Sequence, residues 1–388
     1  MAVATGQRTT GNVASSQRVI DMHKKILLLE PDAAPLLQIS KSANRMRAND
    51  PKFSWHNDQA EQRFDAINNG AGYADNATSL VVDTGTAFAP EDIVYVPRTG
   101  EVISVTSISV NTLTVTRGQG SSTAAALVDN DPLLIIGTAA EEGDTSQAAR
   151  SENPTKVDNY TQIFKTSVQL SGSLLSSANE SNPHDWAHQQ QKQGIEHKKD
   201  IEYAFMLGSP GTTTGGSGLP RRYTGGILHY ASVNRTDAGG TLTEVEVETW
   251  LRQILRYNSN VTVFVSPLVL SVLNAFAASK LQTSVGANTY GVHVQNWVSG
   301  HGEIKLVKHN LLEGAVLGGY AIAVDFKGGA VAYRYLDGQG APGGSRDTKL
   351  YANRQAPDLD GRLDEWITEC GLQAGLPYRH GVLTGVTG

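Results

Sequence analysis

The pattern of polar and apolar residues predicts one unusually long helix near the middle of the chain. It runs from Pro183 to Gly208 without an internal proline, Asn182 can cap it, and the Gly-Ser-Pro sequence at 208–210 ends it. Its expected packing face follows positions four and three residues apart: Ala187, Gln191, Gly194, Lys198, Ile201 and Phe205. Only the last two are large and apolar. We therefore expect the helix to lie along a surface or a subunit boundary and to be anchored by its C-terminal end.

Short strand-like runs separated by turn residues dominate the sequence before this helix. They cover residues 52–67, 81–82, 93–96, 102–110, 113–115, 133–136 and 163–170. The spacing of the middle runs predicts a small barrel or sandwich of roughly 55 residues, folded as a unit inside a longer excursion of the chain.

The sequence after the helix mixes helices with strands. Thr243 and Glu246 form a capping-box pattern that opens a helix to about Tyr257, and Ser266-Pro267 starts another helix. Strand-like runs lie at 261–265, 290–298, 304–307, 320–326, 331–335 and 366–372. This order predicts an α+β domain of roughly a hundred residues.

Composition narrows the possible functions. The 388 residues include 32 basic and 38 acidic ones, and the net charge of −6 argues against a dedicated nucleic-acid binder. The single cysteine, Cys370, excludes an internal disulfide framework and a cysteine-cluster metal site, and a small buried apolar role is favoured for it. No segment approaches the roughly 18 to 20 apolar residues that span a bilayer. Since the N-terminus lacks the apolar core of a signal peptide, we expect synthesis and retention in a cytoplasm.

Two motifs could carry chemistry. His184 and His188 are spaced like the zinc ligands of metallopeptidases, but Asp185 stands where the general-base glutamate would be. A metal-dependent hydrolase is therefore a weak alternative, with helix capping and surface hydrogen bonds as the simpler interpretation. The sequence at 338–343 matches a glycine-rich phosphate motif, yet no helix follows it, so we interpret it as a loop. We predict no catalytic residue, cofactor or bound metal.

The order of these parts resembles the major capsid proteins of tailed bacteriophages. The resemblance is carried by NYTQIFKTSVQLSGSLLSSAN before the helix, HKKDIEYAFMLG at its end and GILHY after it. VHVQNWVSGHGEIKLVKHNLL and the C-terminal CGLQAGLPYRHGVL add to it. The chain is similar to one subgroup of these proteins, which carries a small β insertion ahead of the helix.

The resemblance implies an α+β capsid fold with four parts. The first two are an N-terminal arm at 1–50 and an extended loop region at 51–175, which contains the β insertion at about 81–137. The third is a peripheral domain at 176–225 and 326–388, which contains the long "spine" helix at 183–207. The fourth is an axial domain at 226–325. The arm is mildly basic; it is either loosely ordered or touches a neighbouring subunit or nucleic acid.

The resemblance also implies a structural function. The protein would be a subunit of an icosahedral phage head that assembles with itself as pentamers and hexamers and encloses double-stranded DNA without reading its sequence. Portal and scaffolding proteins would be its further partners, with cement proteins as additional candidates, and the virion would be its location. A non-viral nanocompartment shell is the alternative within the same fold.

Seven residues are candidates for contacts between subunits. Arg221 and Arg222 lie in a glycine-rich loop and could pair with acidic groups on a neighbour, namely Glu141, Glu142 and Asp144. The alternative is that both arginines are simply solvated. Trp55 and Trp186 stand on polar elements and are candidate interface anchors, with a core role as the equal alternative.

Overall fold

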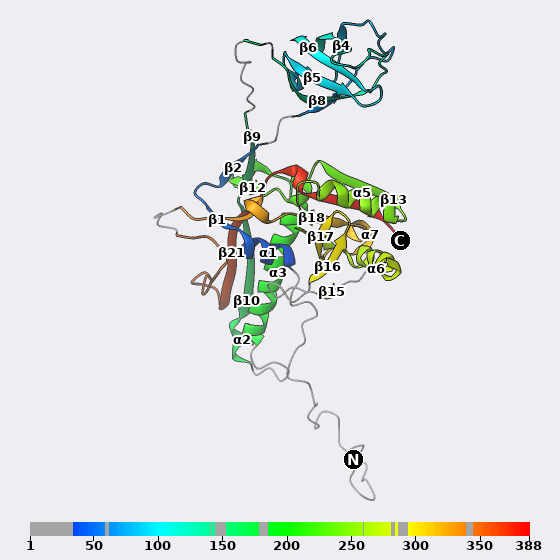
Figure 1. Cartoon of the computed structure of the whole chain (residues 1–388). Helices are drawn as coiled ribbons and strands as arrows, with labels where there is room; N and C mark the ends of the chain where they lie inside the picture. The colour runs from blue at the N-terminus through cyan, green and yellow to red at the C-terminus, as the bar shows by residue number, and fades with distance from the viewer. Residues whose placement is uncertain are drawn as a thin grey trace, which may run out of the picture. The chain divides into compact units, whose positions relative to one another are not determined.

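The computed structural model describes residues 34–58, 62–140, 142–143, 153–177, 185–258, 260–280, 284–285, 294–338 and 344–388. The fold is α+β and contains two compact units (Figure 1). Residues Asp58–Thr155 form the first, called the barrel unit here, and the remaining residues form the main unit. None of the helices in the described part of the chain is both long enough and apolar enough to cross a membrane.

The barrel unit is built from six strands in the order β3-β8-β5-β6-β7-β4. Their bounds are β3 (Phe64–Ala66), β4 (Ser79–Val81), β5 (Asp92–Val96), β6 (Glu101–Ser109), β7 (Thr112–Thr116) and β8 (Pro132–Thr138), with a 3₁₀ turn η3 (Gly85–Ala87). The ends of the two outermost strands also pair: the Asn68 N–H donates to the Val81 carbonyl at 2.9 Å, and the Asp83 N–H donates to the Ala66 carbonyl at 3.1 Å. The sheet therefore closes on itself, which leaves little unpaired strand edge.

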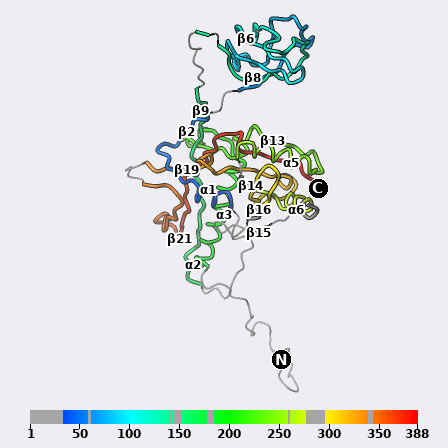
Figure 2. Tube along the Cα trace, viewed as in Figure 1, coloured from blue at the N-terminus to red at the C-terminus, as the bar shows by residue number. Residues whose placement is uncertain are grey.

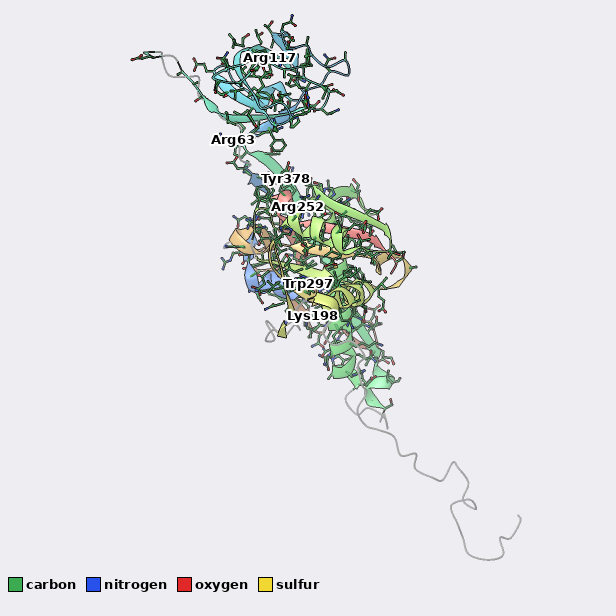
Figure 3. All side chains as sticks on the ribbon, turned by 45° about the vertical axis from the view of Figure 1, so that its right-hand side comes forward. Arg63, Arg117, Lys198, Arg252, Trp297 and Tyr378 are labelled. Carbon is green, nitrogen blue, oxygen red and sulfur yellow. The ribbon has the colours of Figure 1, made fainter. Side chains whose placement is uncertain are left out.

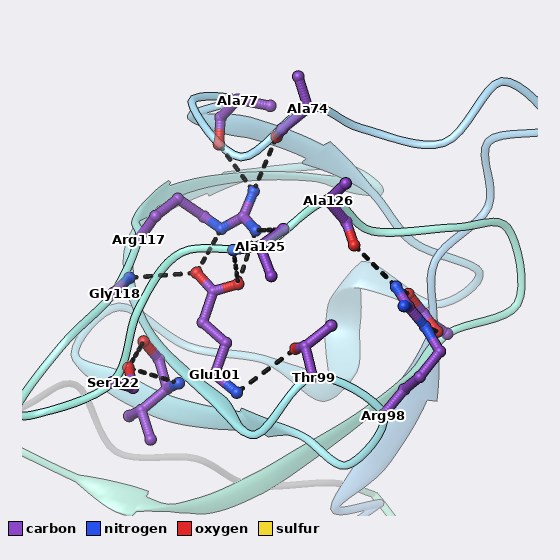
Figure 4. Close-up of polar contacts among 12 residues, drawn as sticks. Ala74, Ala77, Arg98, Thr99, Glu101, Arg117, Gly118, Ser122, Ala125 and Ala126 are labelled. Atoms are coloured by element: carbon purple, nitrogen blue, oxygen red, sulfur yellow. Dashed lines mark hydrogen bonds and ion pairs between the residues drawn. The ribbon is translucent and has the colours of Figure 1, made fainter.

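An ion pair that is almost completely buried crosses the interior of the barrel (Figure 4). The Arg117 guanidinium donates to both carboxylate oxygens of Glu101 at 2.7 Å, and also to the carbonyls of Ala74, Ala77 and Ala125. Burial alone would raise the pKa of Glu101, but the hydrogen bonds from Arg117 and from backbone N–H groups lower it. Because Arg117 bonds to the loops on both sides, it fixes segments that no strand pairing holds.

The main unit contains a five-stranded sheet flanked by helices. β1 (Arg45–Ala48) lies parallel to β19 (Val331–Leu336), which pairs with β21 (Gly361–Ala374); β10 (Gln162–Ser171) and β20 (Lys349–Tyr351) also pair with β21. Four helices contact strands of this sheet: α1 (Pro35–Ala43), α2 (Gly172–Ser176), α3 (Asp185–Leu207) and α4 (Ile227–Tyr230). Although α1 comes early in the chain, it lies beside α3 and β19 (Figure 2). Two-stranded pairs form from β2 (Lys52–Asn57) with β9 (Thr155–Tyr160), and from β11 (Gly211–Thr214) with β12 (Pro220–Tyr223).

A seven-stranded mixed sheet forms the rest of the main unit, in the order β13-β22-β18-β14-β17-β16-β15. The strands are β13 (Asn234–Gly240), β14 (Asn260–Val265), β15 (Ser284–Val285), β16 (Val294–Ser299), β17 (Gly302–Lys308), β18 (Ala321–Val324) and β22 (Gly381–Val386). Its helices are α5 (Glu244–Ile254), α6 (Pro267–Lys280) and α7 (Gly314–Leu317), with 3₁₀ turns η4 (Lys327–Gly329) and η5 (Pro377–Arg379). The predicted capping box of Thr243 and Glu246 is confirmed.

Three expectations about the chain's organisation need correction. Part of the predicted arm belongs to the core, because Pro35–Ala43 is an amphipathic helix whose Leu36 and Leu37 are buried. The C-terminal strand β22 lies in the seven-stranded sheet, where it pairs with β13 and β18. The single strand expected at 52–67 is two strands, β2 and β3, which belong to different sheets.

Candidate functional site

Helix α3 packs on the five-stranded sheet through a face that is mainly polar. Gln190 donates to Asp364, and the Trp366 indole N–H donates to the Gln190 carbonyl at 3.2 Å. One helical turn later, Gly194 faces the same indole: a Cβ at this position would lie 3.3 Å from the ring. The missing side chain lets the helix approach the sheet closely at this point.

His197 forms the next contact between α3 and the sheet. Its Nδ1 lies 2.9 Å from the Thr166 hydroxyl on β10, and its Nε2 lies 2.7 Å from the Thr368 hydroxyl on β21. Burial of the ring, together with the nearby positive charge of Lys41, lowers the pKa of His197 to about 4. A neutral imidazole that bridges two hydroxyls therefore joins the helix to both strands at neutral pH.

Glu202 connects three parts of the main unit that are distant in sequence. Its carboxylate accepts the backbone N–H groups of Leu36 and Leu37 at 2.7 Å, at the start of α1. One of its oxygens also lies 2.7 Å from Nε2 of His309, just after β17, and both side chains are fully buried. A carboxylate at a helix N-terminus satisfies orphan donors and complements the helix dipole. This junction holds α1, α3 and the seven-stranded sheet together.

The opposite side of α3 is exposed along its length. Of its 23 residues only five are buried, and four of them lie in its last two turns: Ile201, Glu202, Phe205 and Met206. The predicted C-terminal anchoring is confirmed. The predicted packing face is wrong for Ala187, Gln191 and Lys198, which are exposed (Lys198 in Figure 3). The true face includes Gln190 and His197, because the helix packs through hydrogen bonds as well as apolar contacts.

Arg221 and Arg222 lie on β12 of a short antiparallel hairpin. Arg221 is exposed and Arg222 half-buried, and neither forms an ion pair with a carboxylate in the described ranges. Hydrogen bonds from Thr213 and Arg221 lower the pKa of Tyr223 on the same strand. The hairpin also exposes Leu219, 69% of which is accessible to solvent. It thus presents positive charge beside an apolar side chain, which suits a protein contact.

The other described candidates for contacts between subunits differ in how exposed they are. Trp55 is only 7% exposed and packs edge-on against Tyr230, so it takes the core role that the sequence left open. Trp186 is half-buried on α3, and the Arg362 guanidinium lies 4.7 Å from its ring centre. Glu142 is exposed.

Three of the residues singled out from the sequence, Glu141, Asp144 and His184, lie outside the described residues. The predicted pairing of Arg221 and Arg222 with acidic groups of a neighbouring subunit stays a prediction. Within the ranges that are described, no three His, Cys, Asp or Glu side chains gather as a metal site. Cys370 is buried, as expected, and burial raises the pKa of its thiol to about 12.

Sequence reasoning missed the residues that position α3. Glu202 and His309 are 107 residues apart, and a glutamate in a largely polar helix looks like a solvent-facing residue. The one usable signal was its place next to Ile201, in the half of the helix already expected to be anchored.

Comparison with known proteins gives the family. The family model described as the SU10 major capsid protein matches residues 3–387. The major capsid protein of Pseudomonas phage PaMx41 is 26% identical over 335 residues, which cover 81% of this chain and 79% of that protein.

Two solved structures show different degrees of similarity to this chain. The capsid of a native GTA particle has a TM-score of 0.50 and 11% identity, covering 99% of this chain and 100% of that chain. An encapsulin complex from Synechococcus elongatus PCC 7942 has a TM-score of 0.42 and 13% identity, covering 61% of this chain and 77% of that one, which is too distant to support the nanocompartment alternative. Since the family match spans nearly the whole sequence, this chain belongs to the SU10 major capsid protein family.

Proposed function

We propose that copies of this chain build the shell of a bacteriophage head as hexamers and pentamers, with the exposed side of α3 and the β11–β12 hairpin as contacts between copies. Membership of a capsid family supports a structural subunit. The observation that carries the more specific proposal is the half-exposed α3, a helix of 23 residues in whose first three turns no residue is fully buried. Such a helix is stabilised further when a neighbouring subunit covers it.

The hairpin supplies a contact of a different kind. Arg221 and Arg222 carry positive charge that no described carboxylate of the same chain neutralises, and Glu142 offers an exposed carboxylate elsewhere on the chain. A contact between two different surfaces of the same chain is heterologous, and such contacts generate closed rings when the rotation between neighbouring copies closes. Each exposed pair contributes only about 0.2–1 kcal/mol, but a shell repeats it in every copy.

We propose that the shell encloses double-stranded DNA without sequence-specific binding. The net charge of −6 fits a wall from which packaged DNA can slide and leave, because a strongly basic wall would hold the phosphates. Portal and scaffolding proteins are the proposed further partners, with cement proteins as additional candidates, and the host bacterial cytoplasm is the proposed place of synthesis. We propose no catalytic activity for the chain.

Electron microscopy and light scattering of the purified protein test this function. We expect closed shells, or rings of five and six copies. The double substitution Arg221→Gln and Arg222→Gln should reduce assembly, and added salt should weaken wild-type assembly in the same direction. Arg252→Gln with Arg256→Gln removes equal charge from another surface of the main unit and serves as the control.

Two outcomes would count against the proposal at different levels. A wild-type protein that remains a monomer or dimer at high concentration, with scaffold supplied, would overturn the shell function. Hairpin variants that assemble like wild type, with the same salt dependence, would overturn the hairpin contact and leave the shell function in place.

A further inference from the structure

The outward face of the barrel unit has an unusual composition. Its six described strands contain three charged residues, Asp65, Asp92 and Glu101, and all three are buried. Asp65 accepts the Thr84 N–H and Asp92 the Ala89 N–H, each at 2.7 Å, and Glu101 is paired inside the barrel. The exposed positions of these strands are therefore all uncharged, whereas the surface of a soluble domain normally carries charges of both signs.

One part of this uncharged face is apolar and exposed. Phe64 is 56% exposed, Leu134 40% and Ile136 53%. Phe64 lies opposite Leu134, Leu134 opposite Tyr95, and Tyr95 opposite Val102, so their side chains cross four adjacent strands. We call these four residues and Ile136 the apolar row. At about 4.8 Å between neighbouring strands, the row spans roughly 15 Å.

We propose that the apolar row contacts the same row of a second copy of this chain, in an isologous contact within the shell. The proposal rests on the proposed shell function. Two copies of an uncharged surface do not repel each other, whereas like charges on facing surfaces would. Nucleic acid is a poor fit for the same reason, because it is bound by basic side chains. Because the barrel is closed, it has little unpaired strand edge for a second copy to pair with, so the contact would be made by the side chains of the row.

The size of the row agrees with a contact that forms only inside an assembly. Five side chains are far fewer than the roughly 20 to 30 residues that each partner contributes to a stable independent interface. The row is too small to hold a dimer together in dilute solution. It becomes effective when other contacts already hold two copies side by side, because the local concentration is then high.

Cysteine crosslinking tests the geometry. Native Cys370 is fully buried, so the thiols of Phe64→Cys, Leu134→Cys and Ile136→Cys, introduced one at a time, can be oxidised selectively by copper phenanthroline. In assembled particles we expect at least one of the three to form disulfide-linked dimers several-fold faster than Val81→Cys. Val81 is 36% exposed on another strand of the same barrel and is the matched control.

The outcomes separate this inference from the shell function. Particles in which none of the three variants crosslinks faster than Val81→Cys would overturn the isologous contact. The same conclusion would follow if their thiols were shielded from maleimide without crosslinking, since another surface would then cover the row. Failure of the wild-type protein to form any particle would instead overturn the shell function.

A second variant tests the energetic role of the row. Leu134→Thr with Ile136→Thr keeps β-branched or strand-compatible side chains while removing apolar surface. We expect the protein concentration needed for assembly to rise about tenfold, with unchanged circular dichroism and melting temperature of the unassembled subunit. Val81→Thr should leave that concentration unchanged. Equal assembly by the double variant and wild type would contradict the proposal.

Discussion

Replacing Glu202 with glutamine tests whether one buried carboxylate holds the main unit together. In the structure its two oxygens accept the N–H groups of Leu36 and Leu37 and lie 2.7 Å from Nε2 of His309. Glutamine has the same size, so Glu202→Gln leaves no cavity. It does replace one accepting oxygen with an amide nitrogen that can only donate.

The expected loss of stability follows from counting hydrogen bonds. The new amide oxygen can still accept from two of the three donors, but the third meets another donor and stays unsatisfied, which costs about 1–3 kcal/mol. The remaining bonds lose their ionic character, and charge-assisted bonds are roughly twice as strong as neutral ones. We therefore expect Glu202→Gln to lower the free energy of unfolding by about 2–5 kcal/mol, a large part of the roughly 5–15 kcal/mol typical of a domain.

Urea unfolding of unassembled subunits, followed by tryptophan fluorescence, measures this change. Glu196→Gln is the matched control: Glu196 lies on the same helix, is 49% exposed and pairs with Lys199 at 3.3 Å, so its loss should cost less than about 0.5 kcal/mol. Hydrogen exchange at the amides of Leu36 and Leu37 should accelerate in Glu202→Gln alone. If the free energy of unfolding of Glu202→Gln lies within about 0.5 kcal/mol of the wild-type value, the carboxylate does not hold the main unit together.

The barrel could be predicted from sequence because its signals are local. Runs of β-branched residues separated by turns predicted five of its six strands. The hairpin between β6 and β7 turns at Val110 and Asn111, one residue before the gap at 111–112 that separates the two predicted runs. The strand β3 was predicted only as the end of one run at 52–67, not as a separate strand, because it contributes only three residues. A pattern of period two needs more residues than that to stand out.

Pairing between distant strands could not be predicted. β22 inserts between β13 and β18, and nothing in its own residues shows that its partners lie far earlier in the chain. Its short, mainly apolar run shows only that it is a buried strand. Tertiary packing therefore decides which sheet β22 joins.

The face of α3 illustrates a limit of hydrophobic periodicity. Spacing placed Gln191 and Lys198 toward the sheet, whereas Gln190 and His197, each one position earlier, make the contacts. When a helix packs through hydrogen bonds, polar residues occur on both of its faces, so polarity no longer identifies the buried side. The apolar end of the helix, where periodicity still holds, was placed correctly.

Three further predictions probe the same packing. Gly194→Val brings a side chain against the indole that Gly194 faces and should lower stability by about 1–3 kcal/mol in thermal melts; Gly137→Val, where nothing lies within 4 Å of a Cβ, should be tolerated. Arg117→Met leaves the Glu101 carboxylate buried without its ion-pair partner, which should lower the free energy of unfolding by about 3–5 kcal/mol. Adding Glu101→Leu should restore part of this lost stability. If the double variant is no more stable than Arg117→Met, the broken ion pair is not the cause of the loss. The pKa of His197 is about 4 in the folded chain and 6.5 when unperturbed. Between these values the unfolded state binds more protons, so stability falls as the pH is lowered through 6.5 toward 4. From pH 6.5 to 5 the contribution of this one residue is about 2 kcal/mol. Urea unfolding at pH 6.5 and pH 5 measures this change in the free energy of unfolding, and His197→Gln should remove it. If the free energy of unfolding of the variant depends on pH as strongly as that of wild type, other groups produce the dependence.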